Sequence, residues 1–136
     1  MIPVPDLCIG NWVYDGDRTQ FPMFIRGIGE DYVYLDFEGN EGDLWESKPE
    51  DLKGIPITKE ILLYSGFRFD GFKEDLIKEY DVFVFRGEIW FELKYSKGGF
   101  RIYINGFNEE SKPVFFLHEL QNLFWNITKQ QLNIKL

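Results

Sequence analysis

The segment His118-Glu119-Leu120-Gln121-Asn122 invites a chemical interpretation first. Helices that bind zinc place two histidines four residues apart, but here the second position is Asn122 and His118 is the only histidine in the chain. A zinc site needs three or four N, S or O ligands, and one histidine with one cysteine, Cys8, is too small a set. The sequence therefore predicts no metal site and a structural or capping role for His118.

A second candidate is the acidic segment 36–43, where oxygen ligands alternate as at the start of a calcium-binding loop. The sixth position, which needs glycine, is Glu41, and the twelfth, which needs a bidentate glutamate, is Ser47. We therefore predict an acidic hairpin turn. It belongs to an acidic band relieved only by Lys48. The band comprises Asp36, Glu38, Glu41, Asp43, Glu46, Glu50 and Asp51. Such a run is usually a solvated face, and the alternatives are a divalent ion or a basic protein surface.

A third candidate is one face of a hairpin predicted from strands at 88–95 and 100–105. Aromatic and basic side chains alternate onto this face, and such platforms hold single-stranded nucleic acid. The residues are Trp90, Lys94, Arg101 and Tyr103. The net charge of −8 and the pI near 4.7 disfavour a phosphate backbone, so nucleic-acid binding is the alternative function.

No catalytic set emerges from the remaining residues. Cys8 lies near the N-terminus, and the sequence places no histidine beside it. Gly98-Gly99 falls between two strands and lacks the following helix N-terminus that phosphate-binding loops use. We predict no catalytic residue and no cofactor; an enzyme would need a pocket that gathers carboxylates with His118.

The bulk composition is that of a folded, acidic chain. At 136 residues it forms one domain or two small subdomains, and 44% hydrophobic and 18% aromatic residues supply a core. A single cysteine excludes an internal disulfide and suits a reducing compartment. The start, MIPVPDL, is not a signal peptide, and no apolar run reaches the length of a membrane span. These features predict a cytoplasmic location without membrane contact.

Short β-type runs separated by turns fill residues 7–56 and predict an SH3-like small β-barrel or curled sheet over residues 1–56. The runs are 11–14, 23–28, 32–37 and 44–47, followed by a tight turn or a single 3₁₀ turn at 48–52 and a boundary at 54–57. Within 32–37, alternation places Val33, Leu35 and Phe37 on the core face.

Residues 57–136 predict an α+β subdomain. Thr58 and Gly66 flank a helix at 59–65. Residues 67–80 mix strand and helix spacing, and we favour a short helix there. Strands follow at 81–86, 88–95 and 100–105, then a polar loop at 106–112. The apolar hairpin face consists of Ile89, Phe91, Leu93, Phe100, Ile102 and Ile104.

An amphipathic helix at about 117–129 is predicted to cover that hairpin face. Its apolar side comprises Phe116, Leu117, Leu120, Leu123, Phe124 and Ile127. The opposite ridge carries His118, Asn122, Trp125 and Lys129, and either another element or a partner covers it. The predicted fold is thus α+β: the N-terminal subdomain packed on a C-terminal antiparallel sheet that this helix covers.

Four blocks carry a resemblance: IGNWVY at 9–14, YLDFEGNEGDLWE at 34–46, IPITKEILL at 55–63 with Gly66-Phe67, and LHELQNL at 117–123. Together they resemble a family of small uncharacterised proteins common in gut-bacterial genomes and their phages or mobile elements. The resemblance omits residues 68–112 and implies a phage or mobile-element setting without an established activity. The family's Thr-Gly after the last helix is Thr128-Lys129 here, so we expect the helix to run further.

The sequence as a whole predicts a non-catalytic protein–protein interaction module, with a basic protein surface as its partner. The candidate binding residues are Glu38, Glu41, Asp43 and Trp45 in the acidic band, together with His118, Asn122 and Trp125 if their ridge is uncovered.

Overall fold

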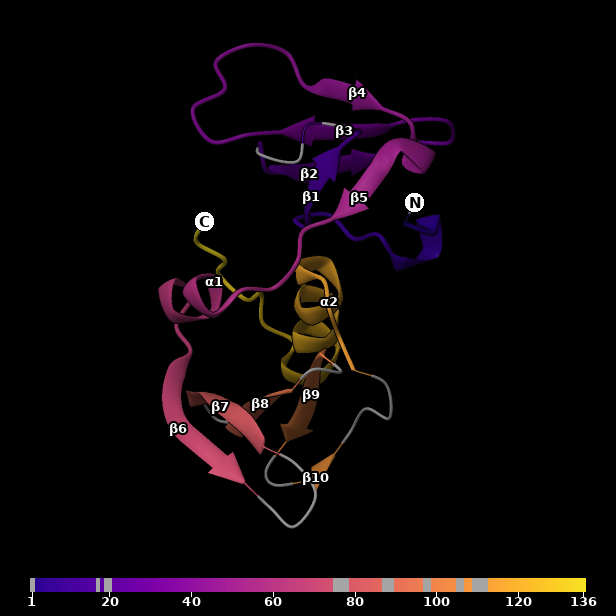
Figure 1. The fold of residues 1–136 in the computed structure, drawn as a ribbon. Helices are drawn as coiled ribbons and strands as arrows, with labels where there is room; N and C mark the ends of the chain where they lie inside the picture. Colours follow the sequence, from indigo (N-terminus) through magenta and orange to yellow (C-terminus); the bar gives the residue numbers. More distant parts are fainter. Residues whose placement is uncertain are drawn as a thin grey trace. The chain divides into compact units, whose positions relative to one another are not determined.

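The computed structural model describes residues 2–16, 18, 21–74, 79–86, 90–96, 99–104, 107–108 and 113–136. Within them the chain is an α+β protein with two antiparallel sheets (Figure 1). Its contacts divide it into two compact units. Unit 1 is Met1–Pro56 with Phe116–Gln131, and unit 2 is Ile57–Phe115 with Leu132–Leu136.

Unit 1 contains an antiparallel sheet of order β4-β3-β2-β1-β5. Its strands are β1 (Trp12–Asp15), β2 (Met23–Ile28), β3 (Val33–Asp36), β4 (Trp45–Ser47) and β5 (Leu52–Gly54), with 3₁₀ helices η1 (Val4–Asp6) and η2 (Pro49–Asp51). The predicted 3₁₀ turn is confirmed. Alternation in β3 is also confirmed, because Val33 and Leu35 are fully buried and Phe37 packs against their cluster.

The sheet of unit 1 is open, so a closed barrel is not formed by the described strands. One side chain nevertheless reaches across it. Asp15, at the end of β1, accepts hydrogen bonds from Trp45 Nε1 at 2.7 Å and from the Ser47 hydroxyl, both on β4. Because β2 and β3 separate β1 from β4 in the ladder, this contact requires the sheet to curl.

Unit 2 begins with helix α1 (Lys59–Tyr64) and continues into a sheet of order β10-β9-β8-β7-β6. Its strands are β6 (Arg68–Glu74), β7 (Glu79–Arg86), β8 (Trp90–Ser96), β9 (Gly99–Ile104) and β10 (Phe107–Asn108). Thr58 Oγ1 accepts the Ile61 N–H and Gly66 takes φ +98°, so both predicted caps of α1 are confirmed. The apolar hairpin face is buried at Phe91, Leu93, Phe100, Ile102 and Ile104.

The short helix predicted within 67–80 is not formed by the described residues of this range, 67–74 and 79–80. Residues 68–74 form β6, which pairs with β7 and places Phe69 opposite Phe83. Phe72 and Tyr80, which contributed to the helical spacing, lie on two different strands, β6 and β7. Residues 75–78, Ile89 and the parts of the loop at 105–106 and 109–112 lie outside the described residues.

Helix α2 (Leu117–Thr128) belongs to unit 1, whereas the sequence-based division placed it with residues 57–116. The Leu117 N–H donates to the Ile55 carbonyl at 2.8 Å, and Pro56 forms an isolated β-bridge with Phe116. These bonds fix the start of α2 beside the end of the β5 segment. Its position against the C-terminal sheet stays a prediction.

The helix does not run beyond its predicted end despite the missing glycine. Lys129 takes the left-handed conformation, φ +57°, that glycine adopts at no steric cost. Thr128 supports this ending, because its hydroxyl accepts the Gln130 N–H at 3.1 Å. None of the helices in the described part of the chain is long and apolar enough to cross a membrane.

The predicted apolar side of α2 is only partly confirmed. Leu117, Leu120 and Phe124 are buried, but Phe116 is exposed. His118, which we placed on the opposite ridge, is 5% exposed, so this part of the ridge is covered. At Asn122 the ridge is covered by the N-terminal segment, through the hydrogen bonds described below, which agrees with the expectation that another element covers it.

We predict that Gly54→Ala destabilises the protein by about 1–3 kcal/mol, the usual cost of overpacking. A Cβ at Gly54 would lie 2.6 Å from Cγ and Cδ1 of the Phe116 ring, so α2 would have to shift. Gly42→Ala is the control, because its Cβ would meet only Asn40 Oδ1 at 3.6 Å. Urea unfolding followed by circular dichroism compares the two variants, and equal midpoints would contradict the docking of α2 on β5.

Candidate functional site

The segment His118–Asn122 lies in the first turns of α2, where Gln121 binds the backbone before and at the start of β1. The Trp12 N–H donates to Gln121 Oε1 at 2.9 Å, and Gln121 Nε2 donates to the Gly10 carbonyl at 3.0 Å. The Gln121 side-chain amide thus pairs with one backbone N–H and one backbone carbonyl, those of Trp12 and Gly10.

Asn122 completes this arrangement, which we call the amide clamp: Gln121 and Asn122 with their partners in residues 6–12. Asn122 Nδ2 donates to the Asp6 carbonyl at 2.8 Å, and Asn122 Oδ1 accepts from Asn11 Nδ2 at 2.8 Å. Asn11, only 2% exposed, also accepts the Cys8 N–H at 2.8 Å. The blocks 9–14 and 117–123, which carry the family resemblance, meet here. The clamp is therefore a docking device, and Asn122 is engaged within unit 1.

His118 is buried beside the clamp. Its ring stacks on Phe116 with centroids 5.9 Å apart and 16° between the planes. Its Nδ1 has no hydrogen-bond partner among the described residues. Burial lowers the pKa of His118 below its usual value of 6.5, opposed by the charges of Glu119 and Asp6, so the ring is neutral at pH 7. No three His, Cys, Asp or Glu side chains of the described residues gather in a metal-binding arrangement.

Trp125 and Lys129 are the exposed members of the predicted ridge. The side chain of Trp125 is 47% exposed, two turns beyond buried His118 on the same helix. The three candidate binding residues of this ridge therefore differ: His118 is buried, Asn122 is held by the N-terminal segment, and Trp125 is exposed.

The acidic turn between β3 and β4 is held by one side chain, Asn40. Its Nδ2 donates to Asp36 Oδ1 at 2.9 Å and to the Asp43 carbonyl at 3.2 Å, while its Oδ1 accepts the Gly42 N–H at 3.0 Å. The Asn40 bond, with the Phe37 N–H, lowers the pKa of Asp36 below its usual value. Asp36 therefore serves the turn itself and is a poor calcium ligand.

The other carboxylates of this turn face water. Glu38, Glu41 and Asp43 are all exposed, as the sequence predicted for a solvated acidic hairpin. The turn that carries them is fixed by its own hydrogen bonds. These three charges are thus presented from a preorganised backbone.

Trp45 stands next to this turn, and its indole is 40% exposed. Its N–H is fixed by Asp15, and the Arg18 guanidinium lies 4.2 Å from the ring centroid. The sequence singled out Trp45 but missed Asp15 and Arg18. No periodic pattern links residues about 30 positions apart, so only the curl of the sheet reveals the cluster.

The alternative face in unit 2 brings three of its four predicted residues together. Lys94 pairs directly opposite Arg101 on β8 and β9, and Lys94 Nζ lies 4.2 Å from the centroid of the Tyr103 ring. The side chain of Trp90 lies outside the described residues.

The net charge is distributed unequally between the units. Unit 1 contains 13 acidic and 5 basic residues, a net charge of −8. Unit 2 contains 10 of each and is neutral. The acidity of the whole chain therefore belongs to unit 1, which also carries the acidic band and Trp45.

Comparison with known proteins gives no significant match to a family model, a curated protein or a solved structure. The geometry of the chain itself must therefore carry the functional argument.

We predict that Asn122→Ala lowers the free energy of unfolding by about 2 kcal/mol, because it leaves the buried Asn11 amide and the Asp6 carbonyl without their partner. Asn126→Ala, on the exposed side of the same helix, is the control for helix propensity and should cost nothing. Urea denaturation measures both. Equal unfolding free energies for the two variants would show that the amide clamp does not contribute to stability.

We also predict a pH dependence from His118. The pKa of His118 is lower in the folded chain than in the unfolded chain, so protonation of His118 favours the unfolded state. The free energy of unfolding is therefore highest above pH 6.5 and decreases as the pH falls through the folded pKa. His118→Phe keeps an aromatic ring beside Phe116 and removes this titration. Unfolding at pH 7.5, 6.5 and 5.5 should show the wild type losing stability relative to the variant, and parallel profiles would contradict the assignment.

Proposed function

We propose that the protein is a non-catalytic protein–protein interaction module whose unit 1 binds a basic surface of its partner. The unequal charge distribution carries this proposal, because one compact unit holds the whole net charge of −8. An acidic surface of this kind accelerates association with a basic partner and discriminates against acidic ones.

Trp45 supplies the aromatic anchor that such an interface needs. Exposed tryptophans are frequent binding hot spots, since a large rigid ring buries much area at low entropic cost. Here Asp15 holds the indole N–H and Arg18 covers the ring, so the orientation of Trp45 is set before binding. The contact of Arg18 with this ring supports the proposal, because a guanidinium of a basic partner has the same chemistry.

The acidic turn adds charge complementarity beside this anchor. Glu38, Glu41 and Asp43 are exposed on a backbone that Asn40 fixes, so ordering them costs little on binding. Salt at physiological strength screens such charges beyond about 8 Å, so their effect is strongest on a partner that contacts the turn directly.

The strand order supports an SH3-like interpretation of unit 1. The five strands follow the order β4-β3-β2-β1-β5, with the 3₁₀ helix η2 joining β4 to β5, as in small SH3-like sheets (Figure 1). Folds of this type often serve as binding modules, although fold alone assigns no partner. The phage or mobile-element setting and the cytoplasmic location stay predictions.

A nucleic-acid-associated role remains the second candidate. The pairing of Lys94 with Arg101 beside the Tyr103 ring favours it, since this combines two cations with a stacking surface. It ranks second because unit 2 is neutral as a whole and unit 1 repels phosphates.

We predict that the double charge reversal Glu41→Lys with Asp43→Lys reduces partner recovery at least about fivefold, given roughly 0.5–1 kcal/mol per exposed charge contact. The immobilised full chain is incubated with a nuclease-treated bacterial extract at low salt, and the bound proteins are quantified by mass spectrometry. The wild type should retain basic proteins that 0.5 M salt releases.

The matched control is Glu60→Lys with Asp70→Lys, which makes the same change in formal charge at exposed positions of unit 2. Circular dichroism checks that both variants fold. Recovery that is unchanged by the reversal at Glu41 and Asp43, or lost equally in both variants, would refute the assignment to the acidic turn. Recovery that depends on leaving out the nuclease would favour the nucleic-acid alternative.

A further inference from the structure

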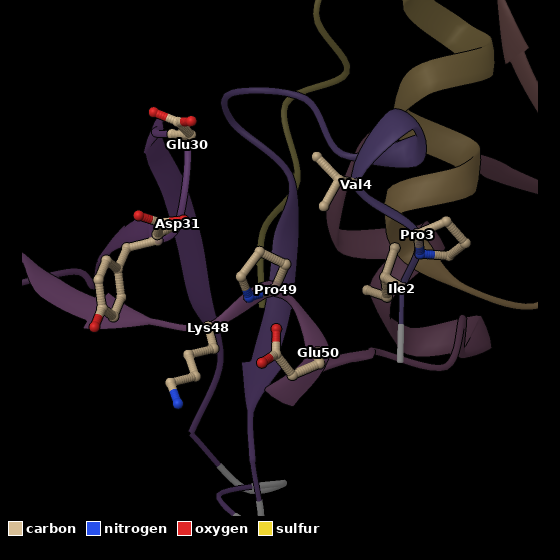
Figure 2. A pocket seen from close by; sticks show the side chains of 9 residues that line it. Ile2, Pro3, Val4, Glu30, Asp31, Lys48, Pro49 and Glu50 are labelled. Atoms are coloured by element: carbon tan, nitrogen blue, oxygen red, sulfur yellow. The ribbon is translucent and has the colours of Figure 1, made fainter.

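A pocket of about 430 Å³ lies in unit 1, between the N-terminal segment, the β2–β3 turn and η2. Figure 2 shows Glu30 and Asp31 on one side of Pro49 and Val4 on the other. The acidic turn leaves β3 at Asp36, whereas the pocket adjoins the turn that enters β3 at Val33. The two features thus lie at opposite ends of this strand.

The pocket has apolar walls. Ile2 is buried beneath it, while Val4 and Tyr32 are exposed by 45% and 40%. Pro49, at the start of η2, adds a rigid apolar surface, since its ring fixes the backbone. A volume within the range of small-ligand pockets, walled in this way, suits an aliphatic chain or a planar group.

Its rim is acidic. Glu30, Asp31 and Glu50 contribute three carboxylates, against a single ammonium from Lys48. All four side chains are exposed, and among the described residues none of the three carboxylates is hydrogen bonded or ion paired. An apolar pocket with an unneutralised acidic rim is complementary to a long cationic side chain and repels phosphate or carboxylate ligands.

We infer that this pocket receives an arginine side chain of the partner protein, an inference that rests on the proposed function. The aliphatic stem of arginine fits against Val4 and Pro49, as such stems do on apolar surfaces. Its planar guanidinium stacks on the Tyr32 ring and bonds a rim carboxylate with two parallel N–H groups. Lysine matches the charge but neither stacks nor bonds in this bidentate way.

The test uses ¹H–¹⁵N NMR titration of the full chain with N-acetyl-arginine amide. The control ligand is N-acetyl-citrulline amide, which keeps the shape and lacks the charge. We expect saturable shifts at residues 2–4, 30–32 and 48–50 with a Kd of roughly millimolar order, as befits a single side chain. The citrulline compound should bind at least about fivefold more weakly. Shifts absent from these residues, or equal for both ligands, overturn the inference.

A matched pair of variants localises the effect. Asp31→Asn with Glu50→Gln should weaken arginine binding at least about fivefold, because it removes two rim charges. Glu41→Gln with Asp43→Asn removes the same charge from the acidic turn and should change the affinity of the pocket for the arginine compound by less than about twofold. Both variants alter exposed residues, so folding is preserved, and a thermal melt checks this. Equal losses in the two variants also overturn the inference.

The two proposals fail separately. If proteins are recovered in a manner that depends on Glu41 and Asp43 but the arginine probe does not shift the pocket, the pocket inference falls and the proposed function stands. If the probe saturates the pocket but no salt-sensitive protein is recovered, the pocket stands and the proposed function falls.

Discussion

The fold of unit 1 depends on satisfying one buried amide, that of Asn11. This side chain binds Cys8 on its own segment and Asn122 on α2, although 111 residues separate Asn11 from Asn122. An unsatisfied buried amide costs more than a hydrogen bond contributes, so only a narrow set of helix positions is tolerated. Gln121 restricts the position of α2 further, because its side-chain amide must bond both the Gly10 carbonyl and the Trp12 N–H.

This constraint decides how the chain is divided. Because α2 completes unit 1, the backbone passes between the two units three times, after Pro56, Phe115 and Gln131. Residues 1–56 alone lack the helix that covers the amides at the start of β1, and those polar groups would then have only water. The division of the contacts does place a unit boundary after Pro56. Residues 1–56 are nevertheless not a complete unit, because unit 1 also contains Phe116–Gln131.

The local elements could be predicted from the sequence more accurately than the way they assemble. Alternation at Val33 and Leu35, and the caps at Thr58 and Gly66, were predictable because their causes lie within a few residues. The helix predicted in 67–80 failed because pairing with β7 outweighed local spacing. The Asn11–Asn122 and Asp15–Trp45 contacts could not be predicted, since hydrogen bonds between distant side chains leave no periodic signal.

The acidic charge of unit 1 has opposite effects on the stability of the isolated chain and on the proposed binding of a basic partner. A net charge of −8 on one small unit repels itself, and this repulsion lowers the stability of the compact state. This value already counts the internal pairs, such as Arg26 with Asp36, so it is the charge that the basic residues of unit 1 leave uncompensated. The basic partner that we propose would relieve part of this repulsion, and if it binds the folded form more tightly than the unfolded chain it would also stabilise that form by mass action. The exposed carboxylates are thus costly in the isolated chain and would be favourable in the proposed complex.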